Sequence, residues 1–227
     1  MKKIKNILLV IEGGDGAGKG TQTTLLSEKL KSLGHIVTVF DFPQYEASVF
    51  GKLVGECLKG DHGDFKAMSS HIASLPYMLD RLTASPQIRL ALKKGIVLCN
   101  RYTPSNTAFQ SSKLSGKKKA EFISFLENAE HDVLGIPKPT RVIYLYVPHK
   151  ISSKLVGLKD ARSHLGGKKG AKDQYEKDQN FQRNVVKTYV ELSKRDDWRM
   201  IDCAPRGELL TREVIHDEIL QVLSDLV

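Results

Sequence analysis

Short apolar runs recur along the chain, and longer segments with the spacing of helices separate them. The runs lie at residues 6–11, 36–42, 96–99, 141–147 and 199–203. Short continuous runs of branched apolar residues are typical of strands buried on both faces of a sheet. Strands that alternate with helices favour a parallel sheet with helices on both faces. We therefore predict an α/β fold with a parallel sheet of about five strands.

The main helical segments are predicted at residues 21–33, 65–94, 172–194 and 211–227. Gly34 follows the first segment and is a suitable residue for the end of a helix. Pro76 and Pro86 lie inside the second segment. Because proline removes a backbone hydrogen bond, we expect broken or kinked helices there. The last segment has its apolar residues on one side, as expected for a helix packed on the core.

The first apolar run leads directly into a glycine-rich loop. From Gly13 to Thr21 the sequence is Gly-Gly-Asp-Gly-Ala-Gly-Lys-Gly-Thr, and a helical segment follows. Glycines let backbone N–H groups turn inward around phosphate oxygens, and the start of a helix adds partial positive charge. This order predicts a P-loop, with Lys19 facing the terminal phosphates of a nucleotide. A glycine-rich turn without a chemical role is the alternative.

We expect every residue of this loop to contribute to nucleotide binding. The predicted residues are Gly13, Gly14, Asp15, Gly16, Ala17, Gly18, Lys19, Gly20 and Thr21. The strict pattern has Ser or Thr directly after the lysine, whereas this chain has Gly20. Thr21 then carries the nearest hydroxyl group for a magnesium ion.

Composition narrows the class of protein. The chain has 227 residues, of which 41% are apolar, and this suits one globular domain over residues 1–227. Its formal net charge of +9 is compatible with binding to nucleic acid, to an anionic membrane surface or to small polyanionic substrates. No basic stripe interleaved with aromatic residues is present, which makes nucleic-acid binding the weakest of these interpretations.

Cysteine usage points to a reducing compartment. Cys57, Cys99 and Cys203 form neither a CxxC pair nor an even set, so we expect reduced, buried thiols in a cytoplasmic protein. The first apolar run ends at Glu12, which is too early for a signal peptide or a membrane span. We expect no contact with a membrane.

Residues 157–172 form a separate glycine-rich, basic segment that includes Lys159, Arg162, Lys168 and Lys169. Such a segment between a strand and a helix could be a disordered surface excursion. It could equally be a lid that closes cations over a phosphoryl group.

Five short motifs follow one another along the chain. They are Gly13–Lys19, Phe42-Pro43 with Tyr45, Tyr77 with Asp80-Arg81, Arg101-Tyr102 with Ser105-Asn106, and Asp173-Gln174-Tyr175-Glu176. In this order, and over nearly the whole chain, they resemble the thymidylate kinase family, whose members phosphorylate dTMP with ATP and magnesium. The resemblance implies a P-loop NTPase-type sheet with helices on both faces and a short basic lid. It also implies a homodimer formed through helices in the 50–130 region.

The resemblance further implies roles for individual residues. Lys19, Asp15, Arg101 and Arg162 would be catalytic, and Asp15 and Thr21 would lie in the metal shell. The residues assigned to dTMP are Asp15, Phe42, Pro43, Tyr45, Tyr77, Arg81, Arg101, Tyr102, Asn106, Gln110, Asp173 and Tyr175. Tyr77 would stack on thymine, and Tyr102 would lie against the sugar. A core aromatic is the alternative for Tyr77, and unpaired surface cations are the alternative for the lid.

This chain departs from the family pattern at three positions. Gly20 replaces the hydroxyl residue after the lysine, and Gln44 stands where close relatives often have arginine. Asn100 replaces the aspartate of the Asp-Arg-Tyr motif. A carboxylate there would help to hold magnesium, whereas a neutral amide cannot neutralise its charge.

We therefore predict ATP-dependent phosphorylation of dTMP to dTDP by a magnesium-dependent cytoplasmic enzyme. A kinase for another nucleoside monophosphate or a deoxynucleoside is one alternative, since pockets discriminate one methyl group by only about 1–3 kcal/mol. A nucleotide-binding homologue with weakened catalysis is another, because of the departures at Gly20, Gln44 and Asn100.

Overall fold

The computed structural model describes residues 6–156 and 173–227. Its strands are β1 (Ile7–Gly13), β2 (Val37–Asp41), β3 (Ile96–Asn100), β4 (Arg141–Tyr146) and β5 (Trp198–Asp202). They form one parallel sheet in the order β2-β3-β1-β4-β5. The predicted α/β fold with a five-stranded parallel sheet is confirmed.

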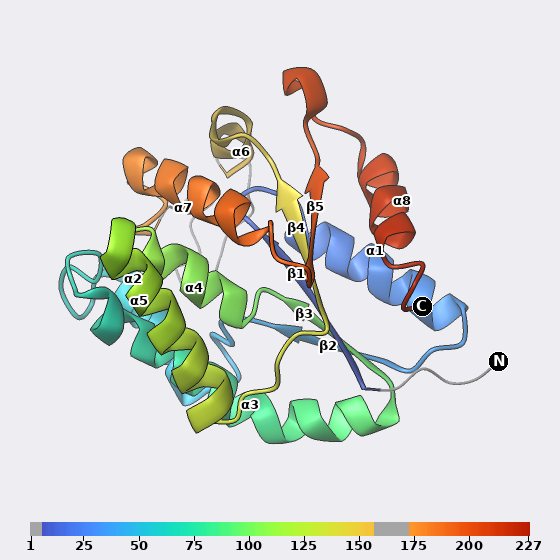
Figure 1. Ribbon diagram of the computed structural model, residues 1–227, viewed down its shortest axis with the longest axis horizontal. Coiled ribbons are helices and arrows are strands. Elements are labelled where there is room, and N and C mark those ends of the chain that lie inside the picture. The colour runs from blue at the N-terminus through green and yellow to red at the C-terminus, as the bar shows by residue number, and fades with distance from the viewer. Residues whose placement is uncertain (1–5, 157–172) are drawn as a thin grey trace.

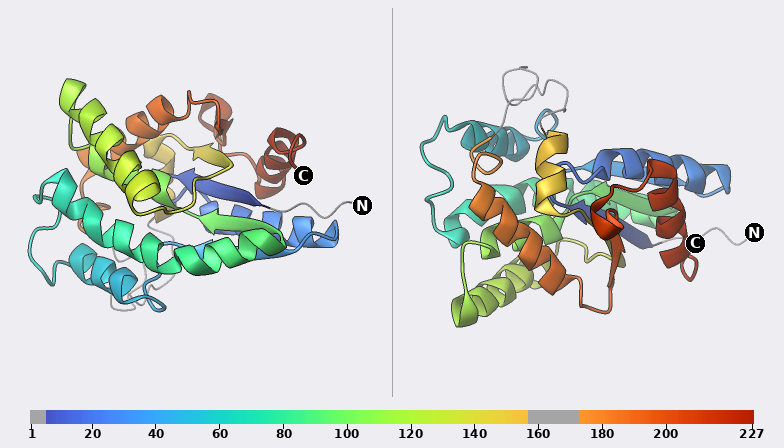
Figure 2. Two further views of the ribbon diagram at one scale, coloured as in Figure 1. Left: turned by 60° about the horizontal axis from the view of Figure 1, so that its bottom comes forward. Right: turned by 90° about the horizontal axis from the view of Figure 1, so that it is seen from above.

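Helices cover both faces of this sheet (Figures 1 and 2). They are α1 (Lys19–Ser32), α2 (Val49–Lys59), α3 (Ser70–Lys94), α4 (Thr103–Ser111), α5 (Gly116–Glu127), α6 (His149–Val156), α7 (Gln179–Leu192) and α8 (Arg212–Val222). Helices α1 and α8 pack on one face, and α3, α4 and α7 pack on the other. A π-helical turn at Asn128–Val133 follows α5, and a 3₁₀ turn at Pro205–Gly207 follows β5.

Alternating residues of the strands form two apolar cores. Leu9 and Leu98 face α1 and α8, whereas Val10 and Cys99 face α3, α4 and α7. Both sets are buried because successive side chains of a strand point to opposite faces. The carboxyl ends of β1, β2 and β3 are therefore fixed by apolar packing on both faces of the sheet.

Two of the expected helices differ from the structure. Helix α3 is continuous through Pro76 and Pro86, so the expected break is wrong. Each proline removes one backbone hydrogen bond, but packing against α2, α4 and β3 holds the helix together. The helix expected at 172–194 is also too long: α7 begins after Asp178, whose carboxylate accepts a hydrogen bond from the Phe181 N–H.

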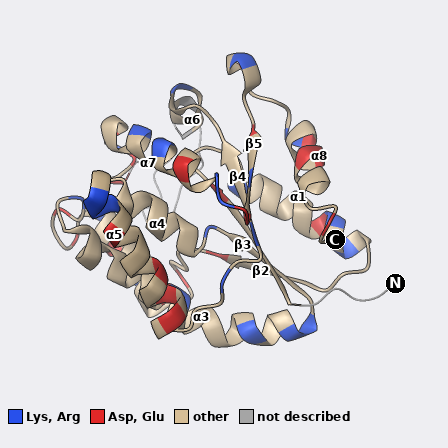
Figure 3. Cartoon of the chain, in the orientation of Figure 1, with Lys and Arg blue, Asp and Glu red and all other residues tan. Residues whose placement is uncertain are grey.

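Cys57, Cys99 and Cys203 are all free and buried, as predicted. Within the described ranges, every helix is too short or too polar to cross a lipid bilayer. Lys and Arg precede Asp and Glu along α5, α7 and α8 (Figure 3). The predicted lid at 157–172, with Arg162, lies outside the described residues.

Candidate active site

A pocket of about 400 Å³ opens at the carboxyl ends of β1, β2 and β3. Ligands of parallel α/β sheets bind at this edge, next to the crossover of the chain. Most of the predicted site residues line it: Asp15, Gly16, Ala17, Gly18, Lys19, Gly20, Thr21, Phe42, Pro43, Tyr45, Tyr77, Arg81, Arg101, Asn106, Gln110, Asp173 and Tyr175. Gly13, Gly14 and Tyr102 do not line it.

The P-loop forms one end of the pocket. Gly18 has a φ of 82°, a left-handed conformation that costs glycine little, and α1 begins at the next residue. Gly13 lies so close to β4 that a Cβ atom there would be 2.9 Å from the Leu145 carbonyl oxygen. Lys19 is buried, and its Nζ donates to the Gly14 carbonyl oxygen at 2.8 Å. The loop therefore presents a helix N-terminus and an ammonium group to an anion.

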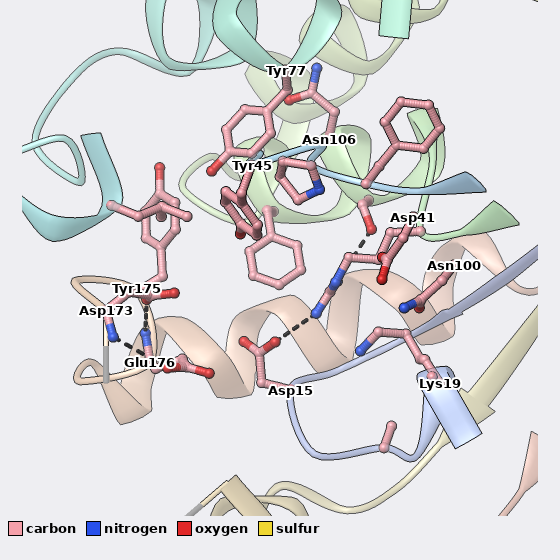
Figure 4. Close-up of a pocket in the computed structure, with 18 of the residues that line it drawn as sticks. Asp15, Lys19, Asp41, Tyr45, Tyr77, Asn100, Asn106, Asp173, Tyr175 and Glu176 are labelled. Atoms are coloured by element: carbon pink, nitrogen blue, oxygen red, sulfur yellow. Dashed lines mark hydrogen bonds and ion pairs between the residues drawn. The ribbon is translucent and has the colours of Figure 1, made fainter. Parts of the chain in front are cut away.

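Arg101 lies in the middle of the pocket, immediately after β3. Its guanidinium lies 2.6 Å from an Asp15 carboxylate oxygen and also donates to the Ser105 hydroxyl (Figure 4). The Gln182 amide donates to the other Asp15 oxygen at 3.2 Å. Although burial lowers the pKa of Arg101, the Asp15 carboxylate has the opposite effect and the net shift is upward. The arginine is thus held charged beside the P-loop.

Glu12 holds this region in place and was missed as a site residue. The fully buried carboxylate accepts hydrogen bonds from the Tyr102 N–H at 2.9 Å, the Ser105 hydroxyl at 2.6 Å and the Tyr189 hydroxyl at 2.7 Å. These bonds fix the turn that carries Arg101. The sequence does show an acidic residue, Glu12, at the end of an apolar strand. A solvent-exposed side chain is the simpler expectation for such a residue.

Tyr102 itself lies away from the pocket. Its ring is fully buried and lies 5.5 Å from the Phe42 ring, between centroids. The hydroxyl has no hydrogen-bond partner among the described residues. The structure therefore does not bring Tyr102 to the position beside the sugar that the motif suggested, because the backbone after Arg101 turns its side chain into the core.

Arg81 and Asp80 form a buried charged pair at the other end. Arg81 is 1% exposed and donates to the carbonyl oxygens of Tyr77 and Tyr102. Its guanidinium lies over the rings of Phe42 and Tyr77, at 5.1 and 5.4 Å from their centroids. Asp80 is fully buried and accepts a hydrogen bond from the Gln44 N–H at 3.0 Å. The pair thus ties α3 to the segment after β2, which contains the cis peptide bond Phe42-Pro43.

Asn106 is oriented by a second residue that was missed. Its amide nitrogen donates to the Ser74 carbonyl oxygen at 3.2 Å and to Glu130 Oε1 at 2.9 Å. Its amide oxygen has no partner among the described residues, and it remains available as an acceptor. Burial raises the pKa of Glu130 to about 8. Nothing in the sequence singled out Glu130, because it reaches Asn106 from a separate π-helical turn.

Aromatic rings complete the base end of the pocket. Tyr45 and Tyr77 point into it from the segment after β2 and from α3, and Tyr175 approaches from the turn before α7 (Figure 4). Gln110 donates its amide nitrogen to the Tyr175 hydroxyl at 3.2 Å. Burial raises the pKa values of Tyr45 and Tyr77, so both hydroxyls are neutral. A flat, neutral base could be enclosed here.

Oxygen ligands for a cation lie at the P-loop end. Thr21, Asp41 and Asn100 line the pocket there, and Asp41 was missed as a candidate. Desolvation by the surrounding groups raises the pKa of Asp41 overall, although a hydrogen bond from Asn100 and the charges of Arg101 and Lys19 act in the opposite direction. In the described part of the chain, no three His, Cys, Asp or Glu residues gather as a metal cluster. A carboxylate, a hydroxyl and an amide still fit magnesium, which takes one or two protein carboxylates with waters and substrate phosphates.

Comparisons with known proteins agree with this geometry. The thymidylate kinase family model matches residues 11–214. The thymidylate kinase of Mycobacterium tuberculosis is 32% identical over 188 residues, covering 82% of this chain and 86% of its own. The human thymidylate kinase is 30% identical over 226 residues, covering 97% of this chain and 91% of its own.

A comparison with solved structures finds a similar fold in the same family. A solved structure of thymidylate kinase from Candida albicans covers 99% of this chain and 93% of its own, with a TM-score of 0.75 and 24% sequence identity. That similarity extends the match from the family motifs to the arrangement of the whole sheet and its helices. The chain belongs to the thymidylate kinase family.

Proposed function

We propose that the protein, as one kinase domain over residues 1–227, transfers the γ-phosphoryl group of ATP to dTMP. One observation carries the proposal: a single pocket joins a P-loop to an aromatic, amide-lined end, with Arg101 between them. Phosphoryl transfer needs positioning and charge stabilisation more than covalent chemistry. The pocket offers both, because two phosphate-bearing substrates can meet at its centre.

In this proposal different residues along the pocket bind ATP and dTMP. Lys19 and the loop N–H groups bind the ATP phosphates, and Arg101 binds the dTMP phosphate beside them. Tyr77 stacks on thymine, Arg81 and the free oxygen of Asn106 bind the base edge, and Tyr45 closes the site. The acceptor phosphate is already ionised near neutral pH, so it attacks the γ-phosphorus in line without a strong general base.

In this proposal Thr21 would hold magnesium through its hydroxyl group, and the ion would supply positive charge to the phosphate oxygens. Asp15 was predicted as a metal residue, but its ion pair with Arg101 makes it a positioning group for that arginine in this proposal. Arg162 and the lid cations would add charge around the γ-phosphoryl group.

We also propose a cytoplasmic homodimer. Large apolar side chains are exposed on or beside the helices expected to meet in it, at Val49, Ile72, Leu75, Leu90 and Phe125. Exposed apolar surface of this kind favours a protein partner. Sedimentation velocity would show a species of twice the chain mass, and a monomer at high concentration would contradict the dimer. The three free, buried cysteines support a reducing compartment.

An ATP-consumption assay across a panel of nucleoside monophosphates tests the activity, with and without magnesium. We expect dTMP to be the preferred acceptor and turnover to stop when magnesium is chelated. Turnover of another monophosphate but never of dTMP would contradict the substrate, and turnover of none would contradict the kinase activity.

A further inference from the structure

Asp41 and Asn100 end neighbouring strands at the P-loop end of the pocket. They are direct partners in the parallel register of β2 and β3. Asn100 hydrogen-bonds to the Asp41 carboxylate. Figure 4 shows the two side chains close to Lys19, on the opposite side of the pocket from Asp173 and Tyr175. The end of β3 therefore carries a neutral amide, and the strand beside it carries a negative charge.

The other acidic residues that line the pocket make interactions elsewhere. Asp15 is ion-paired with Arg101. Asp173 and Glu176 bind each other's backbone N–H groups in the turn before α7. Asp41 has no Lys or Arg within ion-pair distance in the described part of the chain, and the charges of Lys19 and Arg101 offset only part of the rise in its pKa that desolvation causes. It is thus the carboxylate best placed to meet a cation beside the P-loop.

Oxygen atoms from three segments gather around Asp41. A Cβ atom at Gly20 would lie 3.9 Å from the Asn100 amide nitrogen, an ordinary van der Waals contact, so the start of α1 approaches the end of β3 closely. The Asn100 amide oxygen is buried and has no partner among the described residues. Thr21 supplies a hydroxyl to the same end of the pocket. Together these are oxygen donors with one net negative charge, the kind of set that magnesium accepts alongside phosphate oxygens.

We propose that Asp41 supplies the carboxylate that the divalent cation of bound ATP requires, in place of the charge that Asn100 lacks. The inference rests on the proposed function, because it assigns Asp41 to the metal–ATP half of that site. In the family pattern the carboxylate stands at the end of β3, whereas in this arrangement it stands at the end of β2. The amide of Asn100 then orients the Asp41 carboxylate instead of carrying the charge itself.

The test measures binding of Mn²⁺, a spectroscopic substitute for Mg²⁺, to the full-length protein with ATP and without dTMP. Electron paramagnetic resonance reports free Mn²⁺ directly. We expect Asp41→Asn to weaken Mn²⁺ binding by about 10- to 100-fold, as loss of a metal-site partner does. The double variant Asp41→Asn with Asn100→Asp returns the charge to β3 and should recover most of the affinity.

Asp202→Asn is the matched control. Asp202 ends β5 at the same edge of the sheet, is exposed like Asp41, and loses the same charge in the variant. We expect its Mn²⁺ binding to match that of the wild type. Equal ATP affinity of Asp41→Asn and wild type in EDTA, with equal melting temperatures, would place the loss at the metal.

Three results would overturn the inference. They are unchanged Mn²⁺ binding in Asp41→Asn, an equal loss in Asp202→Asn, or a loss of ATP affinity that is just as large in EDTA. Failure to phosphorylate dTMP would contradict the proposed function but leave the Mn²⁺ result standing. Absence of any Mn²⁺ or ATP binding by the wild type would contradict both.

Discussion

The two ends of the pocket are built in different ways. At the P-loop end, one continuous segment presents backbone groups and Lys19 to the pocket, and Asp41 and Asn100 join it from the ends of β2 and β3. The base end comes from segments far apart in the sequence, held together by the buried ionisable side chains of Asp80, Arg81 and Glu130. At the P-loop end, a functional side chain can therefore change without loosening the fold. At the base end, recognition and stability depend on the same residues.

The largest effect that separates the two ends is expected for Arg81→Met. The variant keeps most of the volume but leaves Asp80 buried beside no cation. Breaking a buried pair in this way costs about 3–5 kcal/mol of unfolding free energy. Urea denaturation should show this loss, and the KM for dTMP should rise as well.

Lys19→Met is the counterpart at the P-loop end. Its turnover should fall by about 10²–10³-fold, as for removal of one charge-stabilising donor. Its free energy of unfolding should change by about 1 kcal/mol or less, because one hydrogen bond to Gly14 is lost. Comparable stability losses in the two variants would contradict the distinction between the ends.

A smaller effect is expected from Glu130→Gln, which tests the buried carboxyl at the base end. Burial raises the pKa of Glu130 to about 8 in the folded protein, from an ordinary value of 4.5. Between these pH values the unfolded chain loses a proton that the folded protein keeps. Glu130 therefore lowers stability as pH rises through this window, by up to about 1.4 kcal/mol per pH unit, and its contribution is constant outside it.

Glutamine cannot titrate, so the variant should lose this part of the pH dependence. The difference in unfolding free energy between variant and wild type should grow from pH 5 to pH 8 in favour of the variant. The amide oxygen of the introduced glutamine could still accept the Asn106 hydrogen bond, so the KM for dTMP at pH 7 should change little. A difference that stays flat across this range would show that Glu130 ionises normally in the folded protein.

The same contrast explains what the sequence could reveal. The P-loop and the parallel sheet were predictable, because a strand, a glycine-rich loop and a helix follow one another within a short segment. Arg81 and Asn106 were identified through the family motifs, but Glu130 and Glu12 were not. Their partners are distant in sequence, and only the fold brings them together. Asp41 was missed for the same reason: its significance depends on its register with Asn100.

The smallest effect is expected for Tyr77→Phe. The ring of Tyr77 lines the pocket, and its hydroxyl makes no hydrogen bond among the described residues. Stacking uses the face of the ring, so the phenylalanine variant should keep the KM for dTMP within about threefold, which is less than 1 kcal/mol. Tyr77→Ala removes the face and should raise KM by roughly 1–3 kcal/mol, or about 5- to 150-fold. Steady-state kinetics with dTMP would measure both. Equal losses in the two variants would mean that the hydroxyl, and not the ring face, binds the substrate, and the base end would then recognise dTMP by polar contacts alone.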